Sequence, residues 1–287
     1  MGRIRNSIEL IKASWEVLKK DKELLALPVI SGVATLIVAA TFLVPLFATE
    51  SLSTDSQPDS VLTYIVLFAA YVALAYVTIF FNAALVSAAN ERLNGGDPTL
   101  GSAIAGARRR AGKILPWAIV SATVSIILRA IEERSPAVGR FVAGIAGMAW
   151  AVVTFLVLPI IVIEGLSVGD AIKKSGNMFK RTWGENLAAQ MGFGIIGFLA
   201  MIPGIAIIFL GASAGGAVLG VAIALGVAWI VLVVVVMAAL SVIFQTALYH
   251  FASNGSVPSG YFSADTMSSA FAKRRGRSGR GFGGIGG

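Results

Sequence analysis

The stretch LSVGDAIKKSGNMFKRTWGENL, residues 166–187, decides how the chain is interpreted. Arranged as an α-helix, it places an apolar stripe on one face and its basic residues on the other. The stripe consists of Val168, Ile172, Ser175, Phe179 and Trp183. The basic residues are Lys173, Lys174, Lys180 and Arg181. This pattern is typical of a helix lying in a membrane surface, with its stripe towards the hydrocarbon and its lysines towards the headgroups.

The composition of the chain indicates an integral membrane protein. Of its 287 residues, 56% are apolar and only 13% are charged, whereas soluble domains average about 25% charged residues. The chain contains no cysteine, which excludes disulfides, thiolate chemistry and cysteine-ligated metal sites. No pattern in it predicts a cofactor or a metal site.

The apolar residues fall into runs long enough to cross a bilayer, which takes roughly 20 helical residues. The runs cover residues 24–48, 61–89, 114–131, 138–163, 187–210 and 217–251. We therefore expect an all-α, polytopic protein with six transmembrane helices in a single membrane domain, residues 1–272. The remaining residues, 273–287, form a basic, glycine-rich tail whose composition predicts disorder.

The basic amphipathic segment has relatives earlier in the chain. A shift of 68 residues aligns it with residues 98–115, and a shift of 161 aligns it with residues 11–20. The sequence therefore predicts three tandem repeats, each an interfacial helix followed by a transmembrane hairpin. Their approximate bounds are 4–93, 98–165 and 166–252.

The placement of the basic residues predicts the orientation, because cytoplasmic loops are enriched in lysine and arginine. All but three of the 23 lysines and arginines fall on one side of the six spans, the exceptions being Arg129, Arg134 and Arg140. We expect a multi-pass protein of the cell membrane with both termini in the cytoplasm. The net charge of +8 then suits anionic headgroups on that side, and nucleic-acid binding by the tail is disfavoured.

Four positions within or at the ends of the spans carry polar or kinking residues. Asn82 and Gln245 are amides in matching strings, FNAAL and FQTAL. Such amides usually hydrogen-bond between helices, which favours a structural role over a substrate site. Pro159 is expected to kink the fourth span. Glu164 follows at the end of that span, where we expect a water-exposed carboxylate.

Small residues recur every four positions near the start of the last span, a spacing that lets helix backbones approach closely. The stripe consists of Ala212, Gly216, Gly220, Ala224 and Ala228. It predicts packing against either the fifth span or another copy of the chain.

Several strings resemble those of a known family. They include SWEVLKKDKELLALPVISG (residues 14–32), ILRAIEER (127–134) and KRTWGENL (180–187). Together they resemble a family of prokaryotic integral membrane proteins catalogued as a domain of unknown function. The repeat is more distantly similar to the membrane domain attached to some glycerophosphodiester phosphodiesterases. The resemblance implies the fold and the location, and it provides no catalytic residues.

The expected separation of the candidate catalytic residues argues against an enzymatic function. The string GASAG, residues 211–215, fits G-x-S-x-G, but Ser213 and the sole histidine, His250, are 37 residues apart in the same apolar run. A continuous helix would separate them by about 55 Å, whereas a nucleophile and its base need contact. We therefore expect a non-enzymatic scaffold, assembly partner or membrane-organising subunit. The alternative is a transporter or channel for a small solute or lipid, suggested by the repeats, Pro159 and the two amides.

Overall fold

The computed structural model describes residues 2–48, 61–134, 138–182, 188–214 and 216–254, together with 255, 257, 260–262 and 267. The long segments are helical. Their elements are α1 (Gly2–Lys20), η1 (a 3-10 turn, Lys22–Leu25), α2 (Ala26–Ala48), α3 (Val61–Leu93), α4 (Leu100–Arg109), α5 (Ala111–Arg134), α6 (Val138–Thr154), α7 (Val157–Glu164), α8 (Val168–Thr182), α9 (Ala188–Ala214) and α10 (Gly216–Asn254).

Within these residues, six helical segments are long and apolar enough to cross a membrane. They are Lys22–Pro45, Val61–Leu93, Ala111–Glu133, Val138–Glu164, Gly194–Ser213 and Val218–Asn254. Large apolar side chains on them face outwards; Leu36, Phe141 and Phe209 are each at least 70% exposed. A surface of this kind suits hydrocarbon rather than water. The prediction of an all-helical fold with six long apolar segments is confirmed for the described residues, and the length and composition of these segments indicate a multi-pass membrane protein.

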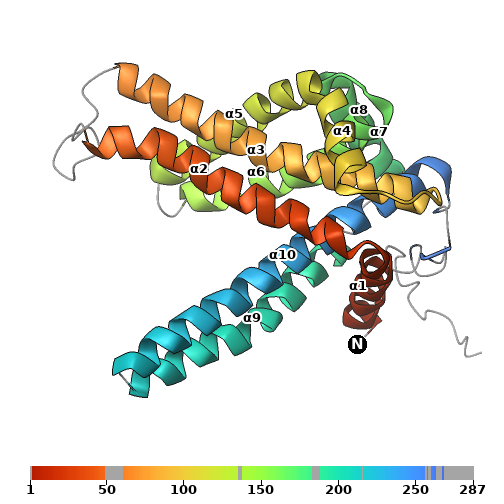
Figure 1. The fold of residues 1–287 in the computed structure, drawn as a ribbon. Coiled ribbons are helices and arrows are strands. Elements are labelled where there is room, and N and C mark those ends of the chain that lie inside the picture. The colour runs from red at the N-terminus through yellow and green to blue at the C-terminus, as the bar shows by residue number, and fades with distance from the viewer. Residues whose placement is uncertain are drawn as a thin grey trace, which may run out of the picture.

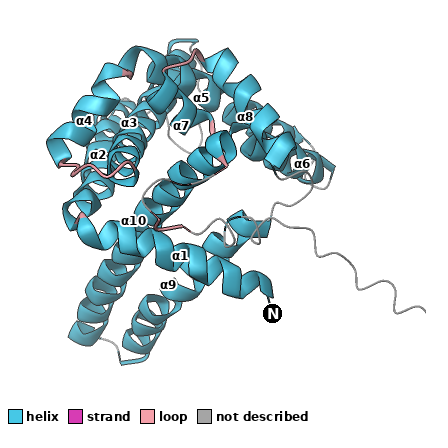
Figure 2. Cartoon of the chain, turned by 90° about the vertical axis from the view of Figure 1, so that its right-hand side faces the viewer, coloured by secondary structure: helices cyan, strands magenta, loops and turns pink. Residues whose placement is uncertain are grey.

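The short amphipathic helices gather at one end of the spans. In Figure 1, α1, α4 and α8 lie towards the right, as does α7, while the end of α2, the start of α3 and the adjoining ends of α9 and α10 lie towards the left. We call this right-hand end the basic end. The hairpin of α9 and α10 runs away from the other spans at an angle (Figures 1 and 2). Each of α1, α4 and α8 precedes two spans, and the relation of these units as repeats stays a prediction.

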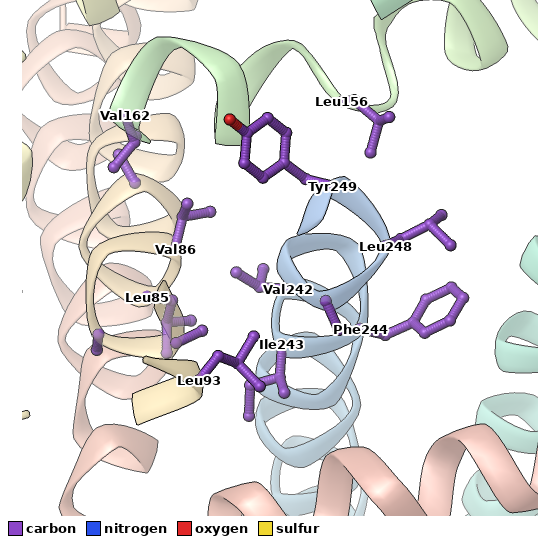
Figure 3. Packing of buried hydrophobic residues seen from close by; sticks show 14 of the residues in the cluster. Leu85, Val86, Leu93, Leu156, Val162, Val242, Ile243, Phe244, Leu248 and Tyr249 are labelled. Carbon is purple, nitrogen blue, oxygen red and sulfur yellow. The ribbon is translucent and has the colours of Figure 1, made fainter. Parts of the chain in front are cut away.

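The tightest packing is at the basic end. Figure 3 shows Leu85 and Leu93 of α3, Val162 of α7, and Ile243 and Tyr249 of α10 converging there. Because lipid is as apolar as leucine, close van der Waals contact rather than hydrophobic burial holds membrane helices together. The second half of α3 and the second half of α10 are the elements that the rest of the basic end packs around.

One face of α1 and much of the apolar stripe of α8 contact the protein itself. On α1, Leu10, Ser14 and Leu18 are fully buried. On α8, Ala171 and Ser175 are fully buried, because α8 packs over α6, α7 and the end of α10. Much of the stripe that the sequence assigned to hydrocarbon therefore contacts other helices. Trp183, the last residue of that stripe, lies outside the described residues.

Glycines allow α9 and α10 to approach closely. A Cβ atom on Gly226 would lie 2.6 Å from the carbonyl oxygen of Gly204, too close for any side chain. The small-residue stripe expected from the sequence is divided between these two helices. Ala212 belongs to α9, whereas Gly216, Gly220 and Ala224 belong to α10, because α9 continues to Ala214. The stripe is therefore not one continuous helical face.

Candidate functional site at the interrupted fourth span

The fourth span is broken between α6 and α7. Phe155 and Leu156 leave the helical conformation, and Pro159 is the third residue of α7. A proline has no N–H to donate to the carbonyl four residues earlier, and its ring clashes with that carbonyl. Here that carbonyl is on Phe155, so the predicted effect of Pro159 is found as a break rather than a bend.

Side chains from two other helices bond to the backbone groups that this break exposes. Gln245 of α10 donates its side-chain N–H to the carbonyl oxygen of Phe155. Ser175 of α8 accepts a hydrogen bond from the N–H of Leu156 at 3.2 Å. Leu156 and Ser175 are fully buried, where an unpaired backbone group would cost about 1–3 kcal/mol. Irregular backbone at membrane depth is tolerated when neighbouring groups satisfy it in this way.

The other end of α7 is held by cations. Arg110 donates its Nε–H to the carbonyl oxygen of Val162 at 3.1 Å, and Lys113 donates to that of Gly165. Positive charge is favourable at a helix C-terminus, where the last carbonyls lack partners. Gly165 has a φ of +67°, and a Cβ there would lie 2.7 Å from Cζ of Arg110. Any other residue here would adopt a strained positive φ and would displace the end of the Arg110 side chain.

Glu164, the last residue of α7, joins three helices. Its Oε1 accepts a hydrogen bond from the hydroxyl of Tyr249 on α10 at 2.7 Å, and its Oε2 pairs with Nζ of Lys174 on α8 at 2.5 Å. The side chain is only 21% exposed. The carboxylate is therefore less exposed than the sequence predicts, because α8 folds back over the end of α7. We call α7, with the side chains bonded to its ends, the α7 junction.

A family model matches this part of the chain. The model of a family described as of unknown function, DUF6159, matches residues 61–260, more than half of the chain. The chain belongs to the DUF6159 family. The matched range includes the whole α7 junction, whereas α1 and α2 precede it. No curated protein matches the sequence.

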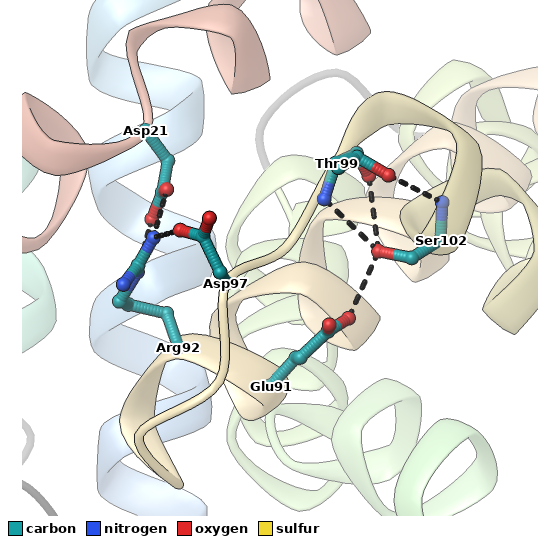
Figure 4. A network of polar contacts seen from close by, with 6 residues as sticks. All are labelled: Asp21, Glu91, Arg92, Asp97, Thr99 and Ser102. Atoms are coloured by element: carbon teal, nitrogen blue, oxygen red, sulfur yellow. Dashed lines mark hydrogen bonds and ion pairs between the residues drawn. The ribbon is translucent and has the colours of Figure 1, made fainter.

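A second set of polar contacts in the DUF6159 chain ties its N-terminal part to α3. The guanidinium of Arg92, at the end of α3, binds the carboxylates of Asp21 and Asp97, as Figure 4 shows. Asp21 is 4% exposed and directly precedes η1. Beside it, Ser102 donates to Glu91 at 2.9 Å and completes a capping box with Thr99 at the start of α4. The turn between α3 and α4 is thereby fixed to the start of the first span.

The residues predicted from sequence have different places in the fold. Gln245, Pro159 and Glu164 meet at the α7 junction. Asn82, the counterpart of Gln245 in the matching string, is half-buried on α3. On α8, Lys173 and Lys180 are exposed, Lys174 pairs with Glu164, and the side chain of Arg181 lies outside the described part.

Sequence reasoning missed the partners of the junction. Ser175 had been placed only on the apolar stripe of its helix, although a hydroxyl amid apolar residues is itself a signal of a buried hydrogen bond. Nothing in the sequence around Tyr249 marks it as a partner of Glu164. Arg110 and Lys113 had been counted only as membrane-surface charges. Nothing in the local sequence shows that these two cations would meet the end of α7.

The chemistry available at the junction is hydrogen bonding and ion pairing. Nε2 of His250 lies 2.8 Å from Oδ1 of Asn90 on α3, and the hydroxyl of Ser213 donates to the carbonyl of Leu210 at the far end of the α9–α10 hairpin. These two residues are therefore not a nucleophile and its base. No cluster of three histidine, aspartate or glutamate side chains suited to a metal occurs among the described residues.

Proposed function

We propose that the DUF6159 chain is a non-enzymatic membrane protein that acts as a scaffold, an assembly partner or a membrane-organising subunit. The observation that carries the proposal is how the polar side chains of the α7 junction are used. Gln245 and Ser175 bond to the break between α6 and α7, and Glu164 bonds to α8 and α10, all within the same chain. Because these polar groups are hydrogen-bonded within the chain, they support the fold and are not available to a ligand. The outer surfaces of the helices are then the part of the protein that can contact partners.

We further propose that the basic end faces the cytoplasm of a cell and that both termini lie there. Lys173 and Lys180 are exposed on α8, and each lysine near an anionic leaflet contributes about 1 kcal/mol to membrane attachment. The basic tail adds to the same positive side.

The proposed contact surface for a protein partner or a second copy is the small-residue face of α10. We define it as Gly216, Gly220 and Ala224, all of which are exposed. A Cβ on Gly220 would meet no atom within 4 Å, so this face is not used for packing within the chain. Small residues at such spacing let a neighbouring helix approach closely.

A substitution at Gly220 tests this proposal. Gly220→Leu should reduce the size of the complex isolated in native nanodiscs with little change in the unfolding temperature, because a Cβ at this position meets no atom of the chain within 4 Å. Val221→Leu enlarges the neighbouring exposed position, which is 61% exposed, and serves as the matched control. A complex of unchanged size in Gly220→Leu, or a parent chain that is isolated as a monomer without partners, would contradict the proposal.

The alternative function is a transporter or channel for a small solute or lipid. The interrupted fourth span favours it, since transporters commonly bind substrates at broken helices. Replacing Asn82 and Gln245 together with leucine separates the two. A transporter would lose flux in proteoliposomes, whereas a scaffold would show no flux to begin with; loss of the Gln245–Phe155 hydrogen bond lowers stability in either case.

Two finer points of the proposal rest on sequence strings. One is that the chain consists of three tandem repeats, which the alignments at shifts of 68 and 161 residues support. The other is the distant similarity to the membrane domain of some glycerophosphodiester phosphodiesterases. That similarity favours a membrane-embedded accessory role, because the catalytic part of such enzymes is a separate domain.

A further inference from the structure

A groove of about 300 Å³ lies between α3 and α5. Hydroxyl-bearing residues line it, namely Tyr71, Thr78, Ser121 and Ser125, alongside aliphatic ones such as Leu74 and Ile79. The groove lies near the middle of both helices, since Ser121 is at the centre of the span Ala111–Glu133 and Thr78 is close to that of Val61–Leu93. The groove is therefore at the depth of the hydrocarbon core and well away from the α7 junction.

Among the described residues, three of the four hydroxyls have no hydrogen-bond partner. The hydroxyl of Thr78 donates to the carbonyl of Leu74 at 3.0 Å. Within the described part of the chain, the hydroxyls of Tyr71, Ser121 and Ser125 make no hydrogen bond to the protein. Serines in membrane helices can bond to the carbonyl four residues earlier, and Thr123 of α5 does so with Ile119. The two serines of the groove instead keep their donors available.

Unpaired hydroxyls at this depth restrict what occupies the groove. Without a partner, each costs free energy in hydrocarbon, so an occupant with oxygen acceptors is favoured over a plain acyl chain. None of the lining residues is charged, and a charged phospholipid headgroup stays at the interface. The volume is at the lower end of that of small-molecule sites and accommodates one compact headgroup.

We propose that the groove between α3 and α5 binds an uncharged lipid through oxygen atoms of its headgroup, which accept hydrogen bonds from Tyr71, Ser121 and Ser125. A diacylglycerol and a quinone share this chemistry, because both carry carbonyl oxygens and no charge. The site is independent of whether the chain acts as a scaffold or a transporter.

A thermal-shift titration tests the site. The full chain in phosphatidylcholine nanodiscs is titrated with 1,2-dioctanoylglycerol, decylubiquinone or hexadecane, because a ligand that binds only the folded state raises the unfolding temperature. We expect a rise with at least one of the two oxygen-bearing lipids and none with hexadecane. Which of the two produces the rise identifies the source of the headgroup.

Variants then assign the rise to the groove. The triple variant Tyr71→Phe, Ser121→Ala, Ser125→Ala keeps the apolar shape of the groove and should weaken apparent affinity at least tenfold. Thr123→Val removes a hydroxyl from the same helix outside the groove and should leave the affinity unchanged. No rise with either lipid, an equal rise with hexadecane, or an unaltered affinity in the triple variant would overturn the proposal.

A labelling experiment on the parent chain needs no substitution. A diazirine-bearing diacylglycerol and a diazirine-bearing quinone are photolysed in the same nanodiscs, and the adducts are mapped by mass spectrometry. We expect one of the two to label residues 71–79 and 121–125 preferentially. Adducts spread evenly over the outward-facing residues of all spans, with both reagents, would contradict a defined site.

Discussion

Replacing Gln245 with leucine should destabilise the protein, because it removes a hydrogen bond to Phe155, a residue far from it in sequence. Gln245 donates to the carbonyl of Phe155, the group that Pro159 leaves without its usual N–H partner. Leucine has a similar volume but no donor. The carbonyl would then remain unpaired at the break between α6 and α7.

The size of the effect follows from the cost of an unpaired backbone group. A buried acceptor that loses its partner costs about 1–3 kcal/mol, while hydrogen bonds between membrane helices average about 0.6 kcal/mol and reach about 1.7. The fully buried neighbour Leu156 indicates that water has little access here. We therefore expect Gln245→Leu to lower the free energy of unfolding by about 1–2 kcal/mol.

A double-mutant cycle identifies the cause. Pro159→Ala restores an N–H that can reach the carbonyl of Phe155, so Gln245→Leu should cost less in that background than in the parent. The coupling between the two changes should be about 1 kcal/mol, within the range for residues that share a partner. Reversible unfolding in mixed micelles, followed by circular dichroism, measures all four chains of the cycle.

Thr246→Val provides the control. Thr246 is the next residue on α10, is fully buried, and donates to Val242 of its own helix at 2.9 Å. Its loss should destabilise the protein without any coupling to Pro159→Ala. The reasoning is refuted if Gln245→Leu leaves stability unchanged, or if its effect and that of Pro159→Ala simply add.

Three further predictions concern other parts of the chain. Gly165→Ala should lower stability by about 1–2 kcal/mol in the same unfolding assay, because alanine resists the positive φ and crowds Arg110; Gly169→Ala, where a Cβ meets nothing within 4 Å, should have little effect. Asp21→Asn should weaken the tie to Arg92 by about 1–3 kcal/mol, seen as faster proteolysis of α1, and unchanged proteolysis would contradict that tie. Cysteines at Ser56, Ser135 and Ser269, all outside the described residues, test the orientation with a membrane-impermeant thiol reagent. In sealed cells we expect the cysteines at Ser56 and Ser135 to react and the one at Ser269 not to react.

The general fold was readable from the sequence because apolar run length and break residues act locally. Six spans follow from 20-residue runs, and the break in the fourth span follows from Pro159. The assignment of Gln245 to a bond between helices also followed from its residue type, since an amide in hydrocarbon needs a partner.

The contacts between segments distant in sequence could not be predicted from the sequence. The periodicity of residues 166–187 identifies an apolar stripe but not what it faces, and Ser175 contacts the α6–α7 break 19 residues earlier. Glu164 looked water-exposed because its partners Lys174 and Tyr249 come from two other helices. The small-residue stripe was misplaced at Ala212 because periodicity continues through a turn that the chain makes at the end of α9.

The most direct test of the central claim, that the polar groups of the α7 junction support the fold and line no solute path, is cysteine accessibility beside Gln245. The chain has no native cysteine, so a cysteine at Val242 or Leu248, which are 8% and 3% exposed, is labelled without background. We predict no reaction with a charged, membrane-impermeant thiosulfonate from either side of the membrane, with full reaction after unfolding and at the exposed control position Ser167. Reaction at Val242 or Leu248 from both sides of the folded protein would reveal a hydrated path to Gln245 and contradict the account.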